Sequence, residues 1–188
     1  MRLFAAILAA TIALTLAFPS ESVAQRRLPT DNELRAAYCA RIVRHEADDL
    51  KHDLELVTRA ISEAEERAKS GQTQSDNNSL NLDSLRSMRD QFQPILRERE
   101  NTFNRLNSYV MPLAGHVEIT GLQAAISRGN LDYEASRRAL NSRGICLRDC
   151  IAGGSTAFEG CQSKCGPGTP PDLEAKFARC RKADWLPY

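Results

Sequence analysis

The stretch Cys146–Cys165 reads CLRDCIAGGSTAFEGCQSKC, in which two C-x3-C pairs are separated by ten residues. Cysteines four positions apart lie on one face of a helix, and the glycine pair between them (153 and 154) is typical of a turn. Facing residues of an antiparallel helical hairpin have a constant sum of their numbers. Cys146 would then face Cys165, and Cys150 would face Cys161. The spacing therefore predicts a helical hairpin closed by two disulfides.

This layout resembles that of the small translocase chaperones of the mitochondrial intermembrane space, in which a helical hairpin carries two such disulfides. The resemblance covers about twenty residues of this chain, from Cys146 to Cys165. The glycine pair in the turn, the N-terminal signal and the long helices before the motif depart from that family's pattern. The resemblance therefore bears on the cysteine connectivity and not on activity.

Cys39 and Cys180 remain, and we expect them to form a third disulfide. Cys39 lies on an apolar face of a long helix with Val43, and Cys180 shares a face with Leu173 and Phe177 of the last helix. An even number of cysteines is typical of a disulfide framework in an oxidising compartment. If they were reduced, the four clustered thiolates could bind zinc or copper. A redox centre would favour a C-x-x-C motif, which the sequence lacks.

Residues 1–24 have the pattern of a secretory signal peptide. Arg2 supplies a positive charge, residues 3–17 are apolar, and Ser22 and Ala24 place small side chains before a cut ahead of Gln25. The apolar run is short for a membrane span, although an uncleaved anchor is the alternative. We therefore expect an exported protein, periplasmic or secreted, with no membrane span after cleavage. The Ala-rich apolar run favours a bacterial periplasm.

Residues 25–112 predict a long antiparallel helical hairpin. Thr30 and Glu33 have capping-box spacing, and neither Gly nor Pro occurs from there to Lys69. Apolar residues then recur with the period of a coiled-coil seam, at Leu50, Leu54, Val57, Ile61, Ala64 and Ala68. A second helix is expected over 82–110, kinked or split at Pro94, after a polar turn at 70–81. The same seam would allow two chains to form a homodimer.

Residues 113–188 predict a cysteine-rich helical subdomain packed on the base of this hairpin. We expect a short helix that stops at Gly129, a second one capped by Asn130, and the disulfide-closed hairpin. Thr156 and Glu159 have capping-box spacing at the start of its second helix. The last helix follows Thr169 and two prolines. The chain shows no alternating β-branched run long enough for a sheet, so the fold class is all-α.

One face of the first long helix carries candidate metal ligands. His45, Asp49 and His52 follow each other by four and three residues and could bind zinc or copper. The alternative is a solvated face, since the surrounding sequence RHEADDLKHDLE is dense with charges. Tyr38 and Ile42 share this face, so the helix is apolar on two sides near its start. We therefore expect the C-terminal helices to pack there.

Composition narrows the class of function. The formal net charge is +1 with interspersed signs, which argues against a nucleic-acid or anionic-membrane surface. No nucleotide-binding or serine-hydrolase motif is present, and the predicted disulfides use every cysteine. We therefore expect a non-enzymatic adaptor, scaffold or chaperone-like protein with no cofactor, binding an unknown protein partner through the long hairpin or its tip. A metal-binding protein is the alternative, and a cell-wall hydrolase has the least support.

Overall fold

The computed structural model describes residues 26–70, 82–153 and 158–187. This part of the chain forms five α-helices and one 3₁₀ helix, and its only β-type pairing is an isolated bridge between Arg27 and Val117. The elements are α2 (Asp31–Lys69), α3 (Leu82–Val110), η1 (Met111–Gly115), α4 (Ile119–Ala152), α5 (Phe158–Cys165) and α6 (Pro171–Lys182). The predicted all-α class is confirmed. None of the described helices is long and apolar enough to cross a membrane.

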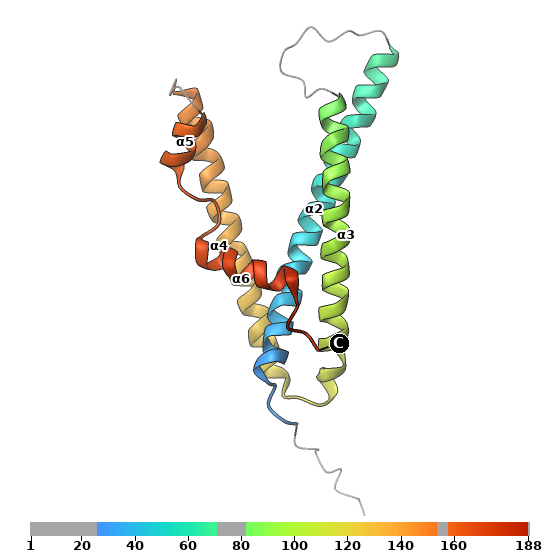
Figure 1. Cartoon of the computed structure of the whole chain (residues 1–188), viewed down its shortest axis with the longest axis vertical. Helices are drawn as coiled ribbons and strands as arrows, with labels where there is room; N and C mark the ends of the chain where they lie inside the picture. Colours follow the sequence, from blue (N-terminus) through green and yellow to red (C-terminus); the bar gives the residue numbers. More distant parts are fainter. Residues whose placement is uncertain (1–25, 71–81, 154–157, 188) are drawn as a thin grey trace, which may run out of the picture.

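α2 and α3 form the predicted long antiparallel hairpin, which is one arm of the molecule in Figure 1. α2 begins at the predicted capping box, in which the Thr30 side chain accepts from the Glu33 amide and the Glu33 carboxylate accepts from the Thr30 amide. These bonds satisfy amide groups that have no partner inside the helix. The predicted turn spans residues 70–81, and its positions 71–81 lie outside the described residues.

Pro94 lies inside α3, which continues without a break from Leu82 to Val110. Of the two expectations for this proline, a kink or a split, the split is wrong. Pro94 is exposed, whereas the neighbouring Phe92 and Leu96 are partly buried. Packing of α3 along α2 stabilises the helix against the loss of one backbone hydrogen bond.

α4 is one helix across the position where we expected two. Gly129 is buried at the crossing with α2, where a Cβ atom would lie 3.1 Å from the Tyr38 carbonyl oxygen and 3.2 Å from the Arg41 Cβ. Asn130 does not cap a helix; its side-chain oxygen accepts a hydrogen bond from Arg41 on α2. Gly129 therefore serves close packing of two helices and not helix termination.

α4 and α5 form a second arm, which diverges from the α2–α3 arm in Figure 1. Disulfides Cys146–Cys165 and Cys150–Cys161 join the two helices, each with a Cα–Cα distance of 5.8 Å. These are the pairs that the spacing predicts. The predicted Thr156 cap lies outside the described residues.

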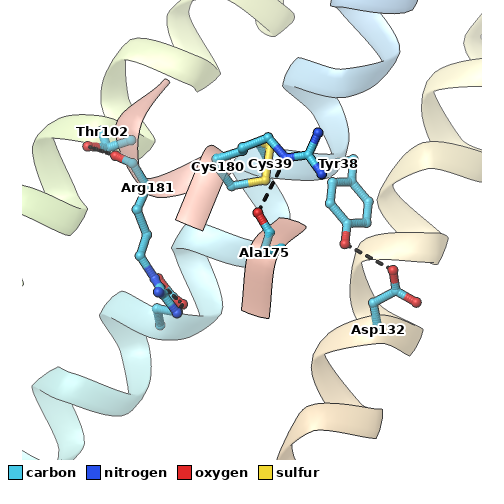
Figure 2. Close-up of a disulfide and its surroundings, with 9 residues drawn as sticks. Tyr38, Cys39, Thr102, Asp132, Ala175, Cys180 and Arg181 are labelled. Carbon is cyan, nitrogen blue, oxygen red and sulfur yellow. Dashed lines mark hydrogen bonds and ion pairs between the residues drawn. A yellow bond between two sulfur atoms is a disulfide. The ribbon is translucent and has the colours of Figure 1, made fainter. Parts of the chain in front are cut away.

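α6 crosses from the second arm to the first and is held there by a third disulfide, Cys39–Cys180. Figure 2 shows this bond together with the hydrogen bond that Thr102 of α3 donates to the Arg181 carbonyl oxygen. The main core lies at this base, where α2, α3 and the C-terminal segment meet. Its buried members are Ala36, Cys39, Ala40, Val43, Leu106, Cys180, Ala183 and Leu186.

The second apolar side of α2 is covered as expected. Ile42 is fully buried against Leu173 and Phe177 of α6, and Tyr38 and Tyr133 pack at the edge of this cluster. The Tyr38 hydroxyl donates a hydrogen bond to Asp132 of α4 at 2.9 Å, as Figure 2 shows. α2 is thus in contact with α3 on one side and with α4 and α6 on the other.

Candidate functional site: the cleft between the two arms

A cleft of about 390 Å³ opens where the two arms diverge. Residues of four helices line it, with Leu50 from α2, Ile95 from α3, Leu140 from α4 and Phe177 from α6 among them. A volume of this size lies within the range of ligand-binding clefts. The long helices α2 and α4 lie on opposite sides of the cleft and pack against each other at the base of the molecule. This packing fixes their separation near the floor of the cleft.

Glu46 of α2 is the centre of an ion network at the floor of the cleft. Its carboxylate accepts from the Arg181 guanidinium at 2.7 Å and from Arg99 Nε at 3.1 Å. Arg181 also pairs with Glu174 on its own helix. The Glu46 and Arg99 side chains are mostly buried, so each charge depends on its partner. The network links α2, α3 and α6.

Tyr133 of α4 forms the adjoining part of the floor. Its ring stacks on His45 with the centroids 4.6 Å apart, and its hydroxyl donates a hydrogen bond to Asp49. Burial, and next the bond to Asp49, raise the pKa of Tyr133 well above its usual value. Tyr133 therefore stays protonated at neutral pH and acts as a hydrogen-bond donor.

The structure does not assemble the predicted metal ligands into one site. His45 Nε2 lies 2.9 Å from the Asn130 side-chain oxygen, Asp49 is bonded to Tyr133 and Arg137, and His52 is exposed. No three His, Cys, Asp or Glu side chains in the described part of the chain are placed to hold one ion. The three side chains are kept apart because α4 packs on the same face of α2 and its Tyr133 and Arg137 bond to Asp49.

On the α4 side of the cleft, the lining consists of Tyr133, Ser136, Arg137 and, as its one aliphatic residue, Leu140. Leu140 lines the cleft and is 47 % exposed. Leu147 and Ile151 follow it at spacings of seven and four residues, which places them on the same face of α4. Leu147 is half-buried and Ile151 is 52 % exposed. A stripe of apolar side chains (Leu140, Leu147 and Ile151, here the inner stripe of α4) therefore continues along the second arm.

This arrangement suits non-covalent binding. All six cysteines are in disulfides, and Glu46 and Asp49 are bonded to arginines. A cleft with internally paired charges at its floor, and with the inner stripe of α4 starting at its lining, offers a partner apolar contact area and few unpaired charges to desolvate.

Several cleft residues have no local sequence signal. Arg181 lies 135 residues from Glu46, and Tyr133 lies 84 residues from Asp49. The sequence places His45 and Asp49 on one face of α2 and predicts that helices pack there, but it does not show that their partners lie on α4.

The chain has no significant match to a protein-family model, a curated protein or a solved structure.

Proposed function

We propose that this chain is an exported, non-enzymatic protein that binds a protein partner in the cleft between its two arms, as an adaptor, scaffold or chaperone-like binder. The observation that carries the proposal is the inner stripe of α4: Leu140 lines the open cleft and is about half exposed, and Ile151, also about half exposed, continues the same helix face beyond it. Single exposed apolar residues are common on protein surfaces, but a stripe that borders a cleft is typical of binding surfaces.

Export is supported by two independent features. Residues 1–24 have the charge and hydropathy pattern of a secretory signal. The three disulfides of the structure favour an oxidising compartment, because cytosolic thiols are kept reduced. The bacterial periplasm and the extracellular space both meet this condition, and the Ala-rich apolar run favours the periplasm.

The chemistry of the cleft favours a partner segment with one apolar face. Helical walls and an apolar stripe match the way in which an amphipathic helix binds in a groove. The paired charges at the floor would contribute to specificity, because a misplaced partner charge would compete with Glu46 or Arg181.

Photocrosslinking tests the proposal with a matched control on the same helix. The photoreactive residue p-benzoylphenylalanine would replace Leu147 on the inner stripe, or Ile145, which is 53 % exposed and lies roughly 140° from Leu140 around α4. In cells that export the chain, we expect a discrete protein adduct from position 147 and not from position 145. Mass spectrometry identifies the adduct, and the two purified proteins must form it again.

A second pair of variants tests the stripe itself. We expect Ile151→Asp to abolish the adduct at position 147 and Ile145→Asp to leave it unchanged, since only Ile151 belongs to the inner stripe. Adducts of equal yield from positions 145 and 147, or none from either, would contradict the proposal. If the adduct were lost only when residues 71–81, at the tip of the long hairpin, are replaced by a Gly-Ser linker, the partner would instead bind at that tip.

A further inference from the structure

A second groove lies at the base of the molecule and shares no lining residue with the cleft. It has a volume of about 360 Å³ and lies between α2, the last turns of α3 and the first half of α4. Its apolar lining includes Ala37, Ala40, Phe103, Val110 and Ile126. Met111 at its edge is 65 % exposed.

The sequence of α2 explains why this site is hollow. Ala37, Ala40, Arg41 and Arg44 are spaced three, one and three residues apart and lie on one face of α2. The two alanines are buried but too short to fill the space toward α3 and α4. The two arginines stand beside them and give the groove a charged edge.

Neighbouring side chains hold both guanidinium groups at the groove. Arg41 donates from Nε to the Asn130 side-chain oxygen, which is a neutral amide. Arg44 lies over the Phe103 ring, with its Cζ 5.3 Å from the ring centroid, and its ion pair with Asp48 at 3.1 Å is half exposed on both sides. An exposed pair of this kind neutralises little of the charge.

The groove thus combines an apolar interior with two positive groups, and its lining contains no acidic residue. We propose that it binds a small anionic amphiphile in its monomeric form, such as a fatty carboxylate. The alkyl chain would lie on the alanines, Val110 and Ile126, and the carboxylate would accept hydrogen bonds from the guanidinium groups. Arginine suits this task because its planar donor array matches a carboxylate.

A free molecule is favoured over a membrane surface as the source of this ligand. The volume of the groove lies within the range of small-molecule sites. The net charge of the chain is only +1, whereas attachment to an anionic membrane surface depends on several clustered basic residues.

Calorimetry on the mature chain with decanoate tests the proposal. We expect saturable one-to-one binding at concentrations below micelle formation, weaker binding of decanol, and none of decyltrimethylammonium. The double variant Arg41→Gln/Arg44→Gln should weaken decanoate binding by about tenfold, or about 1.4 kcal/mol, through the loss of two partly exposed charge contacts. Arg148→Gln, at an exposed arginine far along α4, should leave binding unchanged.

A further variant keeps the test decisive if the arginine variants fold poorly. Met111→Glu changes an exposed side chain at the edge of the groove and should also weaken decanoate binding. The proposal would be overturned by no saturable binding of decanoate, by equal binding of the neutral and cationic analogues, or by binding unaffected by Met111→Glu and by the double arginine variant. Binding only to anionic vesicles, or only to an acidic peptide, would overturn it in favour of those partners.

Discussion

Gly129 and Gly144 occupy the same helix, α4, in opposite surroundings. A Cβ atom at Gly129 would lie 3.1 Å from the Tyr38 carbonyl oxygen, whereas one at Gly144 would have no neighbour within 4 Å. Glycine in a helix interior costs about 1 kcal/mol relative to alanine. At position 129 the absence of a side chain allows α4 to lie close against α2. At position 144 we find no packing reason for it.

This contrast gives a prediction for alanine variants. Gly144→Ala should raise the free energy of unfolding by about 0.5–1 kcal/mol through the higher helix propensity of alanine. Gly129→Ala should lose this gain or be less stable than the wild type, since its methyl group must displace α2. Urea denaturation of both variants with the disulfides intact measures the difference, and an equal gain at both positions would contradict this account of the helix crossing.

At the scale of elements, the start of α2 is fixed by Glu33. Its carboxylate accepts a hydrogen bond from Arg27 Nη1 at 2.7 Å and another from the Thr30 amide at 2.7 Å. Arg27 also connects this segment to the start of α4, because its carbonyl oxygen accepts from the Glu118 amide at 2.8 Å. The Arg27 guanidinium, together with the Thr30 amide, lowers the pKa of Glu33 from 4.5 to about 2 against the opposing effect of burial.

A group whose pKa is lower in the folded state stabilises the fold above its unfolded pKa and loses this contribution as the pH falls. We therefore expect the contribution of Glu33 to be complete above pH 4.5 and to disappear progressively toward pH 2. Unfolding free energies of the wild type and Glu33→Gln, measured across this range, should converge as the pH falls, because the variant cannot titrate there. A difference that is constant with pH would contradict the role of this carboxylate.

The long hairpin could be predicted closely from the sequence. Its helices need only local information, such as the Thr30 cap and the apolar periodicity around Ile61, and α2 and α3 begin and end where these signals place them. The cysteine spacing likewise sufficed for the α4–α5 arm. These features depend on residues close together in the chain.

α4 could not be predicted as one helix because its continuity depends on contacts outside its own sequence. Glycine followed by asparagine is a common signal for the end of a helix. In this chain Gly129 instead allows α2 to pack closely against α4, which the sequence alone does not show. Glu46, Arg99 and Arg181 look like ordinary surface charges in the sequence. They come together only when α2, α3 and α6 have packed at the base. The floor of the cleft could therefore not be predicted from any one segment of the sequence.

At this largest scale, the two arms depend on a small base. The packed contacts of α2 with α3, α4 and α6 gather there, while the distal parts of both arms are stabilised by a narrow helix pair or by disulfides. Glu46 joins three of these helices within one network. Cys39–Cys180 holds α6 covalently in the same region, so the geometry of the cleft depends on a few residues.

The last prediction concerns this network. Glu46→Gln should lower the free energy of unfolding by about 3 kcal/mol, since it leaves the mostly buried Arg99 and Arg181 without their shared carboxylate. Glu65→Gln is the matched control on the same helix. Glu65 also pairs with an arginine of α3, Arg86, at 2.8 Å, but both side chains are about 40 % exposed, and the expected loss is below about 1 kcal/mol.

Urea denaturation compares the two variants, and amide hydrogen exchange locates the effect. In Glu46→Gln, α6 should exchange faster while the disulfide still tethers it, because its ionic contact to α2 is lost. Equal destabilisation by both variants would show that the network contributes no more than a surface pair. Unchanged exchange in α6 would show that Cys39–Cys180 and the packing of Phe177 alone position this helix across the base of the cleft.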